Sequence, residues 1–154
     1  MELKTGIVKL LERGSAEPDA VRFHVPRDAG GWDQVTWGEQ LERSRALALY
    51  MAEQGVEAGT KVSVFATTRL EWAYCCPAIE ACRAVFVPVY FSNTSEQTHY
   101  VVDHSDAEVL FTEMSLLPRL LERWEAYNKV RLVIVWDLAD MADLDPLLEA
   151  AGVD

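Results

Sequence analysis

The chain has 154 residues, of which half are apolar and a quarter are charged, and this composition fits an ordinary globular domain with a sizeable core. Its 14 Lys and Arg against 25 Asp and Glu give a formal net charge of −11. This acidic balance argues against nucleic acid and anionic membrane surfaces as partners, because both are bound by clustered basic side chains.

Targeting signals and membrane spans are not evident in the sequence. The start, Met1–Thr5, lacks the long apolar core of a signal peptide, and no run approaches the roughly 18–20 apolar residues of a membrane helix. Three cysteines, an odd number without a paired framework, indicate a reducing compartment. We therefore expect a cytoplasmic protein without a transmembrane segment.

The first forty residues predict a helix followed by a hairpin. Ile7, Val8, Leu10 and Leu11 suit a short amphipathic helix ending near Gly14. Two short alternating runs follow, 21–25 and 34–37, separated by a glycine-bearing loop at 28–31, which is typical of a β-hairpin.

From residue 38 onward, helical and strand patterns alternate. We predict helices at about 38–54, 69–83, 94–104 and 114–127. Four short apolar runs suit strands covered on both faces, as in a parallel sheet: Lys61–Ala66, Val85–Val89, Glu108–Phe111 and Arg131–Trp136. The predicted fold class is therefore α/β, with a largely parallel sheet and crossover helices preceded by a short β-hairpin.

Three of the predicted helices begin with a capping-box pattern, in which a Thr hydroxyl and a Glu or Gln three residues later satisfy each other's backbone N–H groups. The patterns are Thr36–Glu39, Thr68–Glu71 and Thr94–Gln97. Gly55 stands where a helix C-cap is expected. Pro77 conflicts with the third helix, which must either be kinked or begin later than its capping box suggests.

No stretch of the sequence carries a convincing catalytic, cofactor or metal site. Gly55–Lys61 has the wrong spacing for a phosphate-binding loop and runs from helix to strand. Cys75, Cys76 and Cys82 lack the spacing and the histidine partners of a metal site, so we expect free thiols in the core. The run Asp103–Asp106 suits a helix end, and the three histidines are expected to be structural or solvated.

The carboxyl ends of the predicted strands form the default ligand edge of an open α/β sheet. They carry Thr67, Thr68 and Arg69 after the first strand and Tyr90, Asn93 and Thr94 after the second. Helix capping and loop packing explain these residues better than ligand contact, so we assign no site residue among them.

Seven stretches, taken together in their order, carry a further pattern: Val35–Glu39, Gly55–Val62, Thr68–Trp72, Ala84–Tyr90, Asn93–Gln97, Tyr100–Val102 and His104–Ala107. In this order they resemble the beginning of the adenylate-forming ligases, particularly the long-chain fatty acyl-CoA synthetases. Arg83 stands where that family usually has glycine, and Thr68 where it usually has asparagine.

This resemblance implies an AMP-forming fatty acyl-CoA ligase, which activates a fatty acid with ATP and Mg²⁺ and passes the acyl group to coenzyme A. It implies that residues 1–154 form part of an N-terminal domain, with the hairpin at about 20–37 and βα units at about 38–137. The family's Ser/Thr/Gly-rich phosphate loop and catalytic Lys have no counterpart in these residues. No catalytic, cofactor-binding or metal residue is carried over.

Three hypotheses follow. The first is the N-terminal portion of a long-chain fatty acid–CoA ligase, inactive alone, whose partner is the missing C-terminal part or a second copy. The second is a non-catalytic binding or complementation module derived from that fold. The third is a small flavodoxin-like ligand-binding domain, which is weaker because no nucleotide fingerprint follows any predicted strand.

Overall fold

The computed structural model describes residues 4–153, which form two compact units. Unit 1 combines the residues up to Ala58 with Thr68–Ala84. Unit 2 combines Gly59–Thr67 with the residues from Val85 onward. The chain therefore passes between the units three times.

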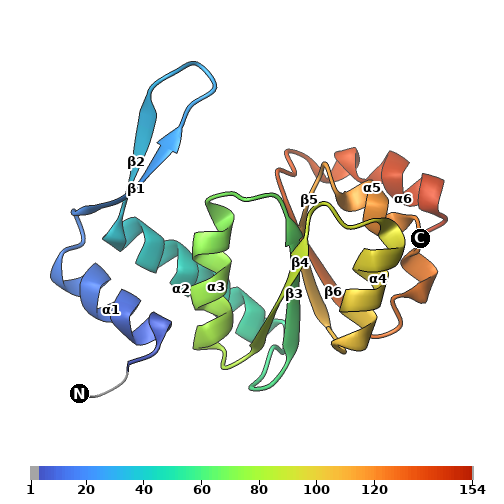
Figure 1. Ribbon diagram of the computed structural model, residues 1–154, viewed down its shortest axis with the longest axis horizontal. Helices are drawn as coiled ribbons and strands as arrows, with labels where there is room; N and C mark the ends of the chain where they lie inside the picture. Colours follow the sequence, from blue (N-terminus) through green and yellow to red (C-terminus); the bar gives the residue numbers. More distant parts are fainter. Residues whose placement is uncertain (1–3, 154) are drawn as a thin grey trace. The chain divides into compact units, whose positions relative to one another are not determined.

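Unit 1 is built on three helices, α1 (Gly6–Ala16), α2 (Trp37–Glu53) and α3 (Glu71–Ala81), which pack against one another (Figure 1). Helix α1, predicted to end near Gly14, continues for two more residues, to Ala16. Gly14 is buried within the helix, where an added Cβ would come within 2.9 Å of Leu41 on α2. The glycine thus permits a close approach between two helices and does not end one.

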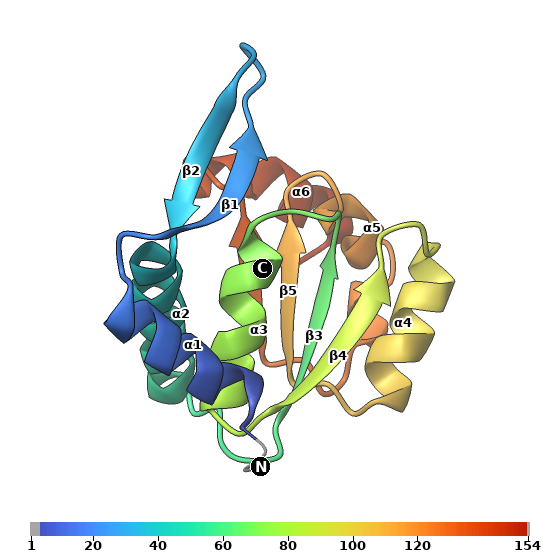
Figure 2. The same cartoon turned by 60° about the vertical axis from the view of Figure 1, so that its left-hand side comes forward.

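The hairpin of unit 1 consists of β1 (Val21–Pro26) and β2 (Trp32–Thr36), which pair antiparallel and extend beyond the helices of this unit (Figure 2). Gly30 and Gly31 in its loop have φ of 86° and 87°, a region in which glycine carries no steric penalty. The predicted hairpin is therefore confirmed.

Helix α2 begins and ends as the sequence predicts. At its start, the backbone N–H of Glu39 donates to the Thr36 hydroxyl at 3.2 Å, and the Thr36 N–H donates to the Glu39 carboxylate at 2.7 Å. After its end, Gly55 has a φ of 74°. Both helix signals are local interactions, and this explains why they could be read from the sequence.

Helix α3 does not use the predicted capping box. It begins at Glu71, and the preceding Leu70 has helical backbone angles and no side-chain cap. The Glu71 carboxylate instead accepts a hydrogen bond from Arg69 at 2.6 Å. The helix thus begins later than its capping-box pattern suggests, but this later start still leaves Pro77 in the helix interior.

Helix α3 also continues through Pro77. In a regular helix, the N–H of residue 77 would donate to the carbonyl of Ala73, but proline has no N–H. The side-chain amide of Gln40, from α2, donates to that carbonyl at 2.7 Å. Gln40 is 2% exposed, so a buried polar group of one helix compensates for the proline of another.

Unit 2 is a four-stranded, wholly parallel sheet in the order β4-β3-β5-β6. Figure 2 shows β4, β3 and β5 running side by side in one direction. The strands are β3 (Lys61–Ala66), β4 (Val85–Tyr90), β5 (Val109–Glu113) and β6 (Leu132–Trp136). The predicted α/β class with a parallel sheet is confirmed.

The helices of unit 2 follow its strands. They are α4 (Ser95–His104), α5 (Leu117–Leu121) and α6 (Asp145–Ala151), with short 3₁₀ segments η1 (Trp124–Ala126) and η2 (Met141–Asp143). The helix predicted at about 114–127 is much shorter than expected. Pro118 lies in the first turn of α5, where proline is tolerated, and Arg123 leaves the helical region before η1.

The core of unit 2 lies between the sheet and these helices. It contains one buried apolar residue from each of β3, β4 and β5, namely Phe65, Val89 and Leu110, together with Val102 of α4 and Leu120 of α5. Burying each such side chain contributes about 1.5–3 kcal/mol before the entropy of ordering is counted. This core fixes the strand ends that form the candidate site.

Candidate functional site

The carboxyl ends of the four parallel strands of unit 2 meet at one edge of the sheet, which is the usual ligand edge in open α/β folds. Glu113, the last residue of β5, is the most buried charged side chain there, with 4% of its surface exposed. Its neighbour across the sheet is the end of β3, because Phe65 of that strand pairs with Thr112.

The Glu113 carboxylate accepts hydrogen bonds from two residues, one that follows β3 and one that follows β5. One oxygen accepts from the backbone N–H of Thr67 at 3.1 Å and from its hydroxyl at 2.8 Å. The other oxygen accepts from the Ser115 hydroxyl at 2.6 Å. A carboxylate held by several donors is stabilised in its charged form and has little freedom to move. The Glu113 carboxylate therefore holds in place Thr67, which directly follows β3, and the turn that follows β5.

Sequence analysis named Thr67 at this edge but missed Glu113. The sequence signal that could have revealed Glu113 is a charged residue at the end of a largely apolar strand. A Glu in such a position is rarely buried unless it has partners. The partner Thr67 is 46 residues away in the sequence, so the pattern alone did not reveal this contact.

A second part of the edge is the loop between β4 and α4. Tyr90, which ends β4, is 79% exposed. The guanidinium of Arg119 donates to the carbonyls of Phe91 at 2.6 Å and Asn93 at 2.9 Å. These two bonds tie the loop to α5, so Arg119 shapes the loop from a distance of 26 residues or more in the sequence.

The N-terminus of α4 is occupied by the chain's own groups. Thr94 and Gln97 form the predicted capping box. The Glu122 carboxylate accepts a hydrogen bond from the hydroxyl of Ser95. A polar groove of about 420 Å³ lies here, lined by residues 91–95 with Arg119 and Glu122. Because the Thr94 hydroxyl accepts from the Gln97 N–H and the Thr94 N–H donates to the Gln97 side chain, the capping interpretation of Thr94 is confirmed.

Two of the edge residues named from the sequence, Thr68 and Arg69, belong to unit 1. Arg69 forms its ion pair with Glu71 there. The structure thus brings Thr67 together with Glu113, and Asn93 together with Arg119.

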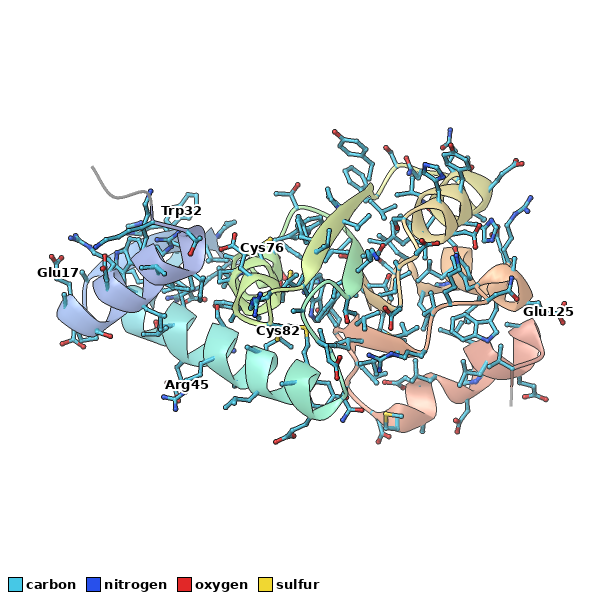
Figure 3. The ribbon with its side chains drawn as sticks, turned by 90° about the horizontal axis from the view of Figure 1, so that it is seen from below. Glu17, Trp32, Arg45, Cys76, Cys82 and Glu125 are labelled. Carbon is cyan, nitrogen blue, oxygen red and sulfur yellow. The ribbon has the colours of Figure 1, made fainter. Side chains whose placement is uncertain are left out.

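The three cysteines are free thiols. Cys75 is buried, whereas Cys76 and Cys82, labelled in Figure 3, are partly exposed, so the expected burial holds fully for Cys75 alone. Hydrogen bonding to Cys76, together with burial, raises the pKa of the Cys75 thiol, and burial raises the pKa of the Cys82 thiol. Raised pKa values leave little thiolate at neutral pH, which disfavours both thiols as nucleophiles.

The three histidines and the run Asp103–Asp106 form no triad. His99 contacts the carbonyl of Ala126 at 3.1 Å, and His104 stacks on Tyr100 with ring centroids 5.4 Å apart. The Ser105 hydroxyl donates to the carbonyl of Val102 at 3.0 Å. The His104 and Ser105 contacts are local contacts at a helix end, as the sequence indicated, whereas the carbonyl that His99 contacts lies 27 residues away in the sequence.

In the part of the chain that the structure describes, no three His, Cys, Asp or Glu side chains gather as metal ligands. Among residues 4–153, no helix has both the length and the apolar character needed to cross a membrane.

Comparison with known proteins gives a coherent result. Residues 11–154 match the AMP-binding enzyme family. The long-chain-fatty-acid–CoA ligase FadD15 of Mycobacterium bovis is 40% identical over 104 residues, which are 68% of this chain and 17% of that protein. The 3-oxocholest-4-en-26-oate–CoA ligase of Rhodococcus rhodochrous is 29% identical over 112 residues, 73% of this chain and 20% of that protein.

The fold agrees with the sequence match. The crystal structure of the N-terminal domain of FACL13 from Mycobacterium tuberculosis superposes with a TM-score of 0.78 at 17% identity, covering 99% of this chain and 38% of that one. The present chain spans about a fifth or less of the length of the two ligases matched by sequence. Because the family match extends over nearly all of its residues, the chain belongs to the AMP-binding enzyme family, that of the adenylate-forming ligases.

Proposed function

We propose that this chain is the N-terminal portion of a long-chain fatty acid–CoA ligase. Such an enzyme activates a fatty acid with ATP, releases pyrophosphate, and transfers the acyl group from the adenylate to the thiol of coenzyme A. The observation that carries the proposal is the 40% identity with FadD15 over 104 residues. On this proposal, residues 1–154 are part of the N-terminal domain of that ligase.

We propose further that the 154 residues are inactive alone. ATP with Mg²⁺ would need polar side chains at the sheet edge that are open to a ligand, whereas the groups there are engaged within the protein. Glu113 accepts from Thr67 and Ser115, and Arg119 donates to two backbone carbonyls. These contacts support a role in shaping loops, and no chemical step is assigned to them.

The same proposal implies a partner, a substrate and a cellular location for the chain. Its partner is the remaining part of the ligase, its eventual substrate is a fatty acid, and its location is the cytoplasm. The net charge of −11 supports the exclusion of nucleic acid as a partner.

The experiment is a segment exchange with FadD15. The matched segment of the mycobacterial ligase is replaced by this chain, and ATP–pyrophosphate exchange and acyl-CoA formation are measured with a long-chain fatty acid. We expect an active chimera and no exchange by the 154 residues alone. Unaltered FadD15 and FadD15 lacking the segment are the controls. A folded but inactive chimera contradicts the ligase assignment, and exchange by the isolated chain contradicts its inactivity.

The second candidate is a binding or complementation module, and the polar groups of the sheet edge that bond within the protein support such a non-catalytic role. The proteins made for the segment exchange also distinguish this candidate from the first. Mixing the separate chain with FadD15 that lacks the segment would restore activity if the chain complements in trans. Activity from the covalent chimera alone would favour the ligase portion.

A further inference from the structure

The two glutamates that flank β5 lie in opposite surroundings. Glu108, directly before the strand, forms an ion pair with Arg131 at 3.3 Å, and 41% of its side chain is exposed. Glu113, the last residue of the strand, is buried at the carboxyl edge of the sheet. The same residue type is therefore solvated at one end of β5 and buried at the end where open α/β folds bind their ligands.

Stability alone does not explain a carboxylate at position 113. Burying a charge costs free energy that its hydrogen bonds must offset, and apolar side chains in place of a buried polar network are often equally stable. The first three residues of β5 are apolar and buried, so the strand is held in the core without a charge. A carboxylate adds several directed hydrogen bonds at once.

These hydrogen bonds join the segments that follow two neighbouring strands. Thr67 donates its backbone N–H and its hydroxyl to one Glu113 oxygen, and Ser115 donates its hydroxyl to the other. Strands β3 and β5 are paired neighbours at the centre of the sheet (Figure 2). One side chain therefore fixes, relative to each other, the points at which the chain leaves the two central strands.

The two outer strands are held from the same part of the chain. The Met114 N–H donates to the carbonyl of Trp136, the last residue of β6, at 3.2 Å. Arg119 holds the loop that follows β4 through two of its carbonyls. Residues 113–119 thus brace the whole carboxyl edge, and Glu113 braces its two central strands.

We propose that Glu113 is a positioning residue for the reaction of the ligase of which this chain is part. It holds the segments after β3 and β5 in the geometry that the complete enzyme requires. It contacts no substrate, because both of its oxygens are engaged within the chain. This inference rests on the proposed function. Functional groups of enzymes often lie on loops held by a rigid scaffold, and a misplacement of about 1 Å can lower the rate about 100-fold.

The test uses the chimera with FadD15 and the substitution Glu113→Gln, which keeps the size of the side chain but replaces one acceptor with a donor. We expect kcat for acyl-CoA formation, counted per folded enzyme, to fall at least about tenfold, with KM for the fatty acid changed less than about threefold. Circular dichroism measures the folded fraction. The loss should persist on cooling, whereas a loss caused by unfolding would disappear. Glu108→Gln, at the other end of β5, is the matched control and should change neither constant.

A second measurement uses the separate chain and involves no reaction. A neutral amide is a weaker acceptor than a carboxylate, so Glu113→Gln should speed amide hydrogen exchange at Thr67 by about threefold or more. Glu108→Gln should leave this exchange unchanged. Unchanged exchange at Thr67 in Glu113→Gln would show that the carboxylate does not hold this segment, and it would overturn the proposal.

The kinetic results separate this inference from the ligase assignment. An inactive unaltered chimera contradicts both. An active chimera in which Glu113→Gln keeps its kcat per folded enzyme, or regains it on cooling, overturns the positioning role alone. If Glu113→Gln does not fold, Ser115→Ala decides, because it removes one donor to the same carboxylate at an exposed position. It should lower kcat about threefold, and an unchanged kcat overturns the proposal.

Discussion

The Gln40 side chain should contribute measurably to the stability of unit 1, because it satisfies the carbonyl that Pro77 leaves without a helical donor. Replacing Gln40 with Leu keeps the side chain's approximate size but removes the amide. The carbonyl of Ala73 would then lack this 2.7 Å hydrogen bond in a buried setting.

The expected loss in the free energy of unfolding follows from the burial of the Ala73 carbonyl. A buried carbonyl that loses its partner costs about 1–3 kcal/mol. Leucine offsets part of this loss, since it adds apolar surface and removes the buried Gln40 oxygen, which has no hydrogen-bond partner. We therefore expect Gln40→Leu to lower the free energy of unfolding by about 1–2 kcal/mol.

A double-mutant cycle with Pro77→Ala identifies the mechanism. In the Pro77→Ala background, residue 77 regains an N–H that can donate to the Ala73 carbonyl, so removing the Gln40 amide should matter less. The expected coupling between the two changes is about 1 kcal/mol. Urea unfolding, followed by tryptophan fluorescence and by circular dichroism, measures all four proteins.

Two results would refute this reasoning. One is additivity, in which Gln40→Leu costs the same with proline or alanine at position 77. The other is a Gln40→Leu protein as stable as the original, which would mean that the Ala73 carbonyl is satisfied in another way.

Four further predictions test individual residues. Burial raises the pKa of Tyr127 to about 12. The folded state therefore keeps a proton that the unfolded state loses above its ordinary pKa of about 10, and stability should fall between pH 10 and 12 by up to about 1.4 kcal/mol per pH unit. Urea unfolding of Tyr127→Phe should lack this dependence. Glu113→Gln should cost about 1–3 kcal/mol because it removes a buried charged acceptor, whereas Glu108→Gln, at a solvent-exposed ion pair, should cost at most about 0.5 kcal/mol by the same assay. Arg83 has a φ of 56°, so Arg83→Gly should raise the thermal midpoint by relieving roughly 1 kcal/mol of backbone strain, and no increase would contradict that strain. Glu80 accepts the first-turn N–H of Ile7 at 2.9 Å, so Glu80→Ala should speed amide exchange at the start of α1 and not elsewhere.

The elements that could be predicted are those defined by local signals. The four strands were found within about two residues because each is a short apolar run bounded by turns. The capping boxes at Thr36 and Thr94 formed as predicted, since all their atoms lie within four residues. The alternation of short apolar strands with helices allowed the parallel sheet to be inferred before any contact was known.

The features that could not be predicted depend on contacts between distant residues. The passage of α3 through Pro77 depends on Gln40, whose amide comes from another helix. The capping pattern at Thr68 fits the motif, but Glu71 pairs with Arg69 and the helix starts later. Glycine is common at helix ends, and Gly14 was therefore predicted to end a helix. In the structure its role is to allow close packing against Leu41.

The candidate site was predicted only in part, for the same reason. Thr67 and Asn93 could be placed at the carboxyl edge because each follows a predicted parallel strand. Their partners Glu113 and Arg119 lie 46 and 26 residues away in the sequence, and a single sequence does not pair them.

The threefold passage of the chain between the units has a consequence for how the protein folds. Unit 1 is discontinuous, because β3 and its flanking residues, Gly59–Thr67, separate its two stretches and belong to unit 2. During synthesis, the first two helices must wait for α3 before their packing is complete, and β3 must wait for β4 and β5. Contacts of such sequence separation slow folding, since loop closure precedes the energetic gain. Neither unit can be isolated by cutting the chain at a single place.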